Sequence, residues 1–105
     1  MSSQPPQLTD EARIAALEKA AEARQVRAEL KRLLKMGSIS FSELLIQADS
    51  DETVAKTKVL TVLESLPGVG KVKARRTMES IGIAQNRRLR GLGEKQRREL
   101  LVAFG

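Results

Sequence analysis

The sequence predicts an all-α protein in which a long N-terminal helix precedes a compact helical domain. Apolar residues recur at three- and four-residue spacing in the segments 41–48, 58–66 and 70–81, which is the period of a helix buried on one side. Thr9 and Ser40 are suited to cap helix starts, and Gly37 and Gly82 stand where helices are predicted to end. A chain of 105 residues has room for one domain with a small core.

We expect residues 1–8 to form a disordered tail and residues 9–37 the long helix. Thr9 is suited to cap its N-terminus, and Gly37 to end it. The first half is rich in alanine and charge. The large apolar residues gather near the end, at Leu30, Leu33 and Leu34. The last third should therefore dock on the core, while the first half projects.

Residues 38–105 are expected to form the compact domain. Ser40 and Glu43 match a capping box at the start of a helix that reaches about Ala48. The polar run 49–52 can cap one more turn. A calcium loop would also need a central glycine and a distal glutamate, which this run lacks, so no metal site is predicted.

A proline–glycine turn joins two predicted helices, residues 58–66 and 70–81. Pro67 cannot continue a helix, and Gly68 and Gly70 permit positive φ. The residues expected to face the core from the second helix are Val72, Ala74, Met78 and Ile81.

The start of that second helix is a candidate phosphate site. A helix N-terminus carries unpaired N–H groups and a partial positive charge, and a basic run follows at once. The candidate residues are Gly68, Val69, Gly70, Lys71, Lys73 and Arg75. An ordinary glycine-containing connection between helices is the alternative interpretation.

A second glycine turn, residues 86–93, precedes a predicted last helix, 94–103. Apolar Leu89 and Leu92 should pin it to the core, and Gly91 and Gly93 should make the turn tight. Its candidate binding residues are Arg87, Arg88, Arg90 and Gly91, followed on the last helix by Lys95 and Arg97. Arginine has a planar fork that can enter a DNA groove. A solvated run of charge is the alternative.

The distribution of charge favours a polyanionic partner. The net charge is +6; residues 1–49 hold seven basic and seven acidic side chains, whereas residues 50–105 hold twelve and six. Only two aromatic residues are present, too few for the stacking platforms of single-strand binders, so we expect a duplex. The chain has no cysteine and no histidine. Its first residues are not expected to act as a secretory signal, and no apolar run is expected to span a membrane.

Two stretches carry a family resemblance. The stretch Leu66–Ala74 alone resembles the phosphate-binding hairpins of helix-hairpin-helix proteins. Combined with the charged N-terminal helix and the stretch Arg87–Gly93, it resembles the actinobacterial integration host factor family over nearly all of residues 7–105. The stretch 87–93 is the most specific part of the likeness.

The resemblance implies a helix-two-turn-helix domain in a nucleoid-associated architectural protein. Such a protein binds double-stranded DNA through phosphates with low sequence specificity. It bends or compacts the DNA, affects supercoiling and supports site-specific recombination. By position, residues 68–71 and Lys73 match the phosphate-gripping hairpin, and residues 87, 88, 90 and 91 match a second turn that faces a groove. A cytoplasmic, nucleoid location follows from the same likeness.

The sequence leaves some alternatives to this function open. A ribosomal-type helix-two-turn-helix protein that binds RNA is the main alternative, since phosphates are common to both polymers. The N-terminal helix is either a solvated helix or an arm that touches DNA or another copy. No enzyme or cofactor is predicted, because neither paired carboxylates nor an activated nucleophile can be identified. A monomer is expected, since no heptad seam is sustained.

Overall fold

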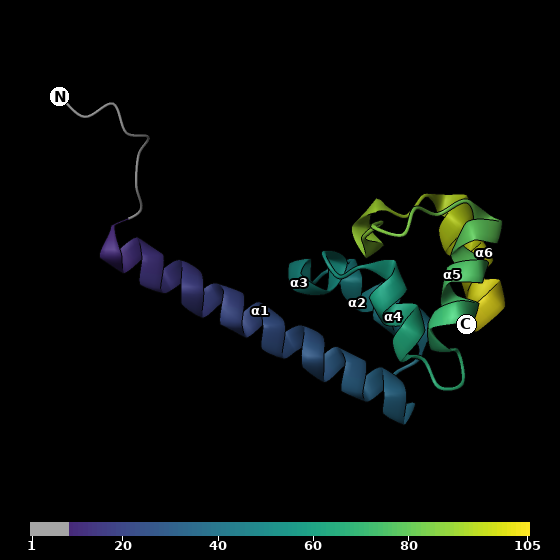
Figure 1. Cartoon of the computed structure of the whole chain (residues 1–105), viewed down its shortest axis with the longest axis horizontal. Coiled ribbons are helices and arrows are strands. Elements are labelled where there is room, and N and C mark those ends of the chain that lie inside the picture. Colours follow the sequence, from purple (N-terminus) through teal and green to yellow (C-terminus); the bar gives the residue numbers. More distant parts are fainter. Residues whose placement is uncertain (1–8) are drawn as a thin grey trace.

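The computed structural model describes residues 9–105 and is all-α in that range, as predicted (Figure 1). The tail predicted for residues 1–8 lies outside the described residues. Helix α1 (Asp10–Met36) is followed by α2 (Phe41–Ala48), α3 (Glu52–Ala55), α4 (Val59–Ser65), α5 (Gly70–Ile81) and α6 (Glu94–Phe104). A single turn of 3₁₀-helix, η1 (Leu89–Gly91), lies between α5 and α6.

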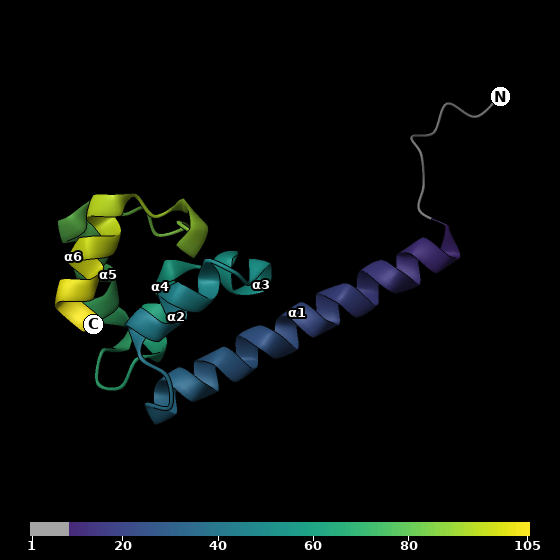
Figure 2. The same ribbon diagram turned by 180° about the vertical axis from the view of Figure 1, so that it is seen from behind.

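Helix α1 packs mainly against α3 and α4. Figures 1 and 2 show, from opposite sides, its first half extending away from the other helices. The Thr9 hydroxyl accepts a hydrogen bond from the Ala12 N–H, and Gly37 ends the helix with φ of 73°. Its 27 residues span about 40 Å at 1.5 Å each.

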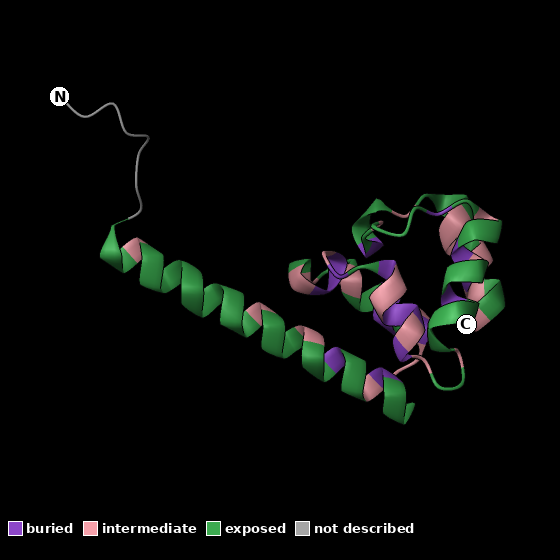
Figure 3. Cartoon of the chain, in the orientation of Figure 1, coloured by how far each residue is buried: buried purple, intermediate pink, exposed green. Residues whose placement is uncertain are grey.

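The core is small and gathers buried side chains from the end of α1 and from α2, α3, α4, α5 and α6. Leu30 and Leu34 are buried there, whereas Ile14 and Leu17 on the projecting half are 55% and 62% exposed (Figure 3). The largest fully buried side chains are Phe41, Leu34, Leu44, Leu63, Met78 and Leu100. The prediction that the last third of α1 docks on the core is confirmed.

Local capping explains the short helices. Ser40 and Glu43 form the predicted capping box of α2. The Asp51 carboxylate accepts hydrogen bonds from the N–H groups of Thr53 and Val54 and so caps α3. Helix α4 is one residue shorter than predicted at each end. At its C-terminal end, Leu66 is extended because the proline that follows disfavours the helical conformation.

One predicted core residue is on the surface. Val72 is 63% exposed, whereas Ala74 and Met78 are fully buried. At 100° per residue, position 72 lies about 200° from position 74, so both cannot face the core. Val72 instead lies between Lys71 and Lys73, within the basic start of α5.

Candidate nucleic-acid interface

The hairpin between α4 and α5 has the geometry expected of a phosphate site. Gly68 and Gly70 adopt φ of 75° and 70°. No side chain caps the N-terminus of α5, and its first turn holds no acidic residue. The N–H groups of this turn are therefore free of a side-chain acceptor, and exposed Lys71 and Lys73 stand beside them. Arg75 is exposed one turn further along.

The left-handed conformation makes glycine necessary at position 70. We expect Gly70→Ala to lower the free energy of unfolding by about 1–2 kcal/mol, because a Cβ is strained at positive φ even though open space surrounds the site. Gly93→Ala is the matched control, since Gly93 has φ of −71°. Urea unfolding of both variants measures the effect, and equal losses would show that backbone strain at Gly70 is not the cause.

The second turn is fixed to the junction between α3 and α4. The Leu89 N–H donates to the Thr57 carbonyl and the Val59 N–H donates to the Arg87 carbonyl, each at 2.9 Å. Lys58 and Arg88 thereby form an isolated antiparallel bridge. Leu89 is only 5% exposed, as predicted for an apolar pin. This turn is thus a rigid part of the domain.

The three arginines of this turn differ in their surroundings. Arg87 folds over Gly91 and donates to its carbonyl oxygen at 2.7 Å. Arg88 donates to the Lys56 carbonyl at 2.7 Å, which uses one of its five donors. Arg90 is exposed and makes no hydrogen bond with another side chain of residues 9–105. Arg90 is therefore the member of the set most fully available to an anion.

Gly91 gives room to the Arg87 side chain and is not required by φ. The tight turn predicted there is a 3₁₀ turn followed by an extended residue, and neither Gly91 nor Gly93 has a positive φ. A Cβ on Gly91 would lie 2.9 Å from Cδ of Arg87. The glycine thus lets the Arg87 side chain lie across the turn.

The two candidate turns lie at opposite ends of α4. The hairpin follows the C-terminus of α4, while Arg88 pairs with Lys58 at its N-terminus. Figures 1 and 2 show the corresponding separation of the two loops. A helix of seven residues is about 10 Å long, so the turns are separate points of contact.

Arg97, predicted as a binding residue on α6, is held by an intramolecular ion pair. Its guanidinium donates through two nitrogens to the Asp49 carboxylate, each at 3.1 Å. The pair joins α6 to the end of α2. Lys95 and Arg98 are exposed.

This ion pair makes the stability of the fold depend on pH. The hydrogen bonds from Arg97 and its charge hold the pKa of Asp49 below its usual value. A carboxyl with a lowered folded-state pKa stabilises the fold above the unfolded pKa of about 3.9, and the contribution is lost as pH falls through the folded pKa. We expect Asp49→Asn to be less stable than the parent at pH 7 and equal to it in strong acid, as urea unfolding would measure. Glu79→Gln is the control, and a loss of stability in the Asp49→Asn variant that persists in acid would contradict the ion-pair explanation.

The structure adds a basic groove that sequence patterns did not predict. Its volume is about 350 Å³, and its lining residues are Arg27, Lys31, Lys56, Thr57, Lys58, Thr61 and Arg88. Five of these are cationic and none is acidic. They come from α1, the α3–α4 junction, α4 and the second turn. These segments include distant parts of the sequence, so helical periodicity could not bring the residues together.

None of the helices in residues 9–105 has both the length and the apolar character needed to cross a membrane. Within the same range, no group of three or more acidic side chains is placed to hold a metal ion.

A family model that matches most of the chain defines the class of its folded domain. The model of the S13-like H2TH domain matches residues 34–104, which covers α2 to α6 together with the docked end of α1. The solved structure of sIHF bound to an 8-bp palindromic DNA is similar to this chain, with a TM-score of 0.80 and 49% identity. The similarity covers 84% of this chain and 99% of that one.

Relatives that align over nearly the whole chain identify its family within this class. The integration host factor of Mycobacterium tuberculosis is 58% identical over 95% of both chains. Those of Mycolicibacterium smegmatis and Streptomyces coelicolor are 57% and 51% identical, with similar coverage. The chain belongs to this integration host factor family, as its sequence features predicted. The same membership bears out the prediction that it is not an enzyme.

Proposed function

We propose that this protein binds double-stranded DNA through its phosphates and acts as an architectural protein of the nucleoid. The observation that carries the proposal is the pair of basic turns at the two ends of α4, neither of which has an acid in its own segment. A relative of 49% identity and the same fold is solved with a DNA duplex, which supports the choice of partner.

The two turns supply different chemistry. The hairpin offers backbone N–H groups and the ammonium groups of Lys71 and Lys73, which bind phosphate without reading bases. The second turn offers Arg88 and Arg90, whose forks suit phosphate or a narrow A·T-rich minor groove. Because these contacts are mostly to backbone, the protein should bind duplexes of many sequences with similar affinity.

Contact at two separated points constrains how a duplex lies on the domain. Low sequence specificity would let many copies bind along a chromosome, as DNA-deforming architectural proteins do. Bending, compaction, an effect on supercoiling and support of site-specific recombination are therefore the roles that we propose. We propose that one monomer provides both turns.

A salt titration of duplex binding tests the proposal. If about five phosphates are neutralised, log K should fall against log salt with a slope near −4.5, which is about 500-fold between 50 and 200 mM. Competition with a structured RNA at matched salt identifies the preferred polymer. A flat salt dependence, or preference for the RNA, would overturn the proposal.

A further inference from the structure

The basic groove beside the second turn carries positive charge that no acid in its lining neutralises. Its five cationic side chains surround one hollow with no acid in the lining. Arg27, Lys31 and Lys58 form no ion pair with any residue of the described range 9–105. Lys56 has a partner, Glu52 at 2.8 Å, but that acid lies outside the lining. Mutual repulsion of this kind favours an anion in the groove.

Acidic and basic side chains lie on different edges of α1, and only the basic edge contributes to the groove. Glu11, Glu18, Glu22 and Glu29 are spaced by seven, four and seven residues, so they share one edge of the helix. The bases Arg24, Arg27 and Lys31 are spaced by three and four residues along a different edge. The basic edge alone opens on the groove, because Arg27 and Lys31 line it and none of the four glutamates does.

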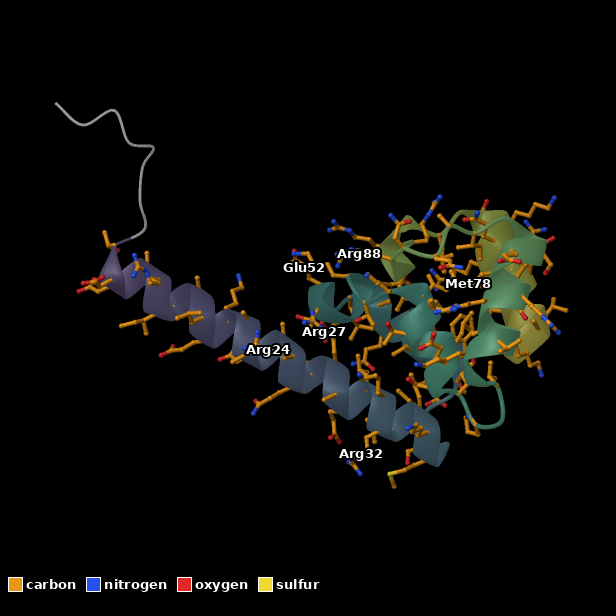
Figure 4. The ribbon with its side chains drawn as sticks, viewed as in Figure 1. Arg24, Arg27, Arg32, Glu52, Met78 and Arg88 are labelled. Carbon is orange, nitrogen blue, oxygen red and sulfur yellow. The ribbon has the colours of Figure 1, made fainter. Side chains whose placement is uncertain are left out.

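The groove is continuous with the second turn. Arg88 belongs to both, and its bond to the Lys56 carbonyl fixes the two walls together. Figure 4 shows Arg27 directed from α1 toward the region of Glu52 and Arg88, while Arg32 is directed away from the domain. Arg90 and Lys19 both help to hold the pKa of Glu52 below its usual value, after the larger effects of Lys56, so the second turn and α1 both carry positive charge near Glu52.

A neighbouring hollow is a poorer candidate. It measures about 540 Å³ and shares Arg27 and Lys56 with the groove, but its lining also includes Glu22 and Glu52. Mixed charge there would repel a phosphate as well as attract it. The acid-free groove is therefore the side of α1 on which an anionic strand can lie.

We propose that this groove seats a phosphate strand of the same duplex that the second turn holds, so that α1 forms one wall of the DNA-binding surface. This inference rests on the proposed function. Arg27 and Lys31 then contact the strand from α1, and Lys56 and Lys58 contact it from the α3–α4 junction. The glutamate edge of α1 keeps DNA off the other side of the helix. The long helix thereby limits how the duplex lies across the domain.

Charge reversals test the groove. We expect Arg27→Glu and Lys58→Glu each to weaken duplex binding about tenfold at 0.1 M salt and to make the salt slope shallower by about 1. Lys58→Glu places an acid at the N-terminus of α4, where the helix dipole favours it, so loss of folding is not expected. Arg32→Glu, with the same change of charge on the other side of α1, should change affinity less than twofold. Equal losses in all three variants would overturn the inference.

Crosslinking gives an independent result. The natural chain has no cysteine, so Lys31→Cys and Arg32→Cys can each carry a photocrosslinker at a single position. Position 31 should crosslink to duplex DNA and position 32 should not. Crosslinks from neither position, in variants that still bind DNA, would overturn the groove assignment and leave the proposed function standing. Failure of the wild type to bind any duplex would instead overturn the proposed function itself.

Discussion

Replacing Arg88 and Arg90 together with alanine should weaken binding to every duplex sequence by roughly 60-fold at 0.1 M salt. Each lost phosphate contact removes a factor of about 8 at that salt concentration, and the slope of log K against log salt should become shallower by about 2. The effect should not depend on sequence, because the contacts are to backbone or to groove shape. A gel-shift or anisotropy titration at two salt concentrations measures both quantities.

The controls separate binding from folding. Arg13→Ala with Arg32→Ala removes the same charge from positions on α1 outside the groove, and should change affinity only slightly. Arg90→Ala alone is the cleaner test, since Arg88 also donates to the Lys56 carbonyl. If the melting temperature of the Arg90 variant fell in step with its affinity, Arg90 would be a structural residue and the binding assignment would be wrong.

Replacing Leu34 with alanine should produce the largest loss of stability at a single position on α1. Leu34 is fully buried where the helix meets the core, and a Leu→Ala change at such a site costs about 2–5 kcal/mol from lost burial and the cavity left behind. In a chain of 105 residues this is a large share of the total stability. Urea unfolding followed by circular dichroism measures the change.

Leu17→Ala is the matched control on the same helix. Leu17 is 62% exposed on the projecting half of α1, and alanine has the higher helix propensity, so the free energy of unfolding should change by less than about 0.5 kcal/mol. A comparable loss at both positions would contradict the division of α1 into a docked end and a projecting half. It would indicate that the first half is also buried, for example against a second copy.

The helices could be predicted from the sequence because their ends depend on local chemistry. Thr9, Ser40 and Gly37 act through hydrogen bonds or φ angles within a few residues, so their neighbours in the sequence suffice to predict them. The hairpin is equally local: Gly68 and Gly70 have the positive φ values that a turn before a basic helix requires.

Only the tertiary structure decided which charged groups act together. Arg88 reaches a carbonyl 32 residues away, and the groove joins α1 to the α3–α4 junction and the second turn. The sequence also did not determine which side of α5 Val72 lies on. An apolar residue in a periodic segment can still face away from the core. Local sequence determines backbone conformation through short-range contacts. The grouping of distant side chains instead follows from how the helices pack, which depends on contacts spread over the whole chain.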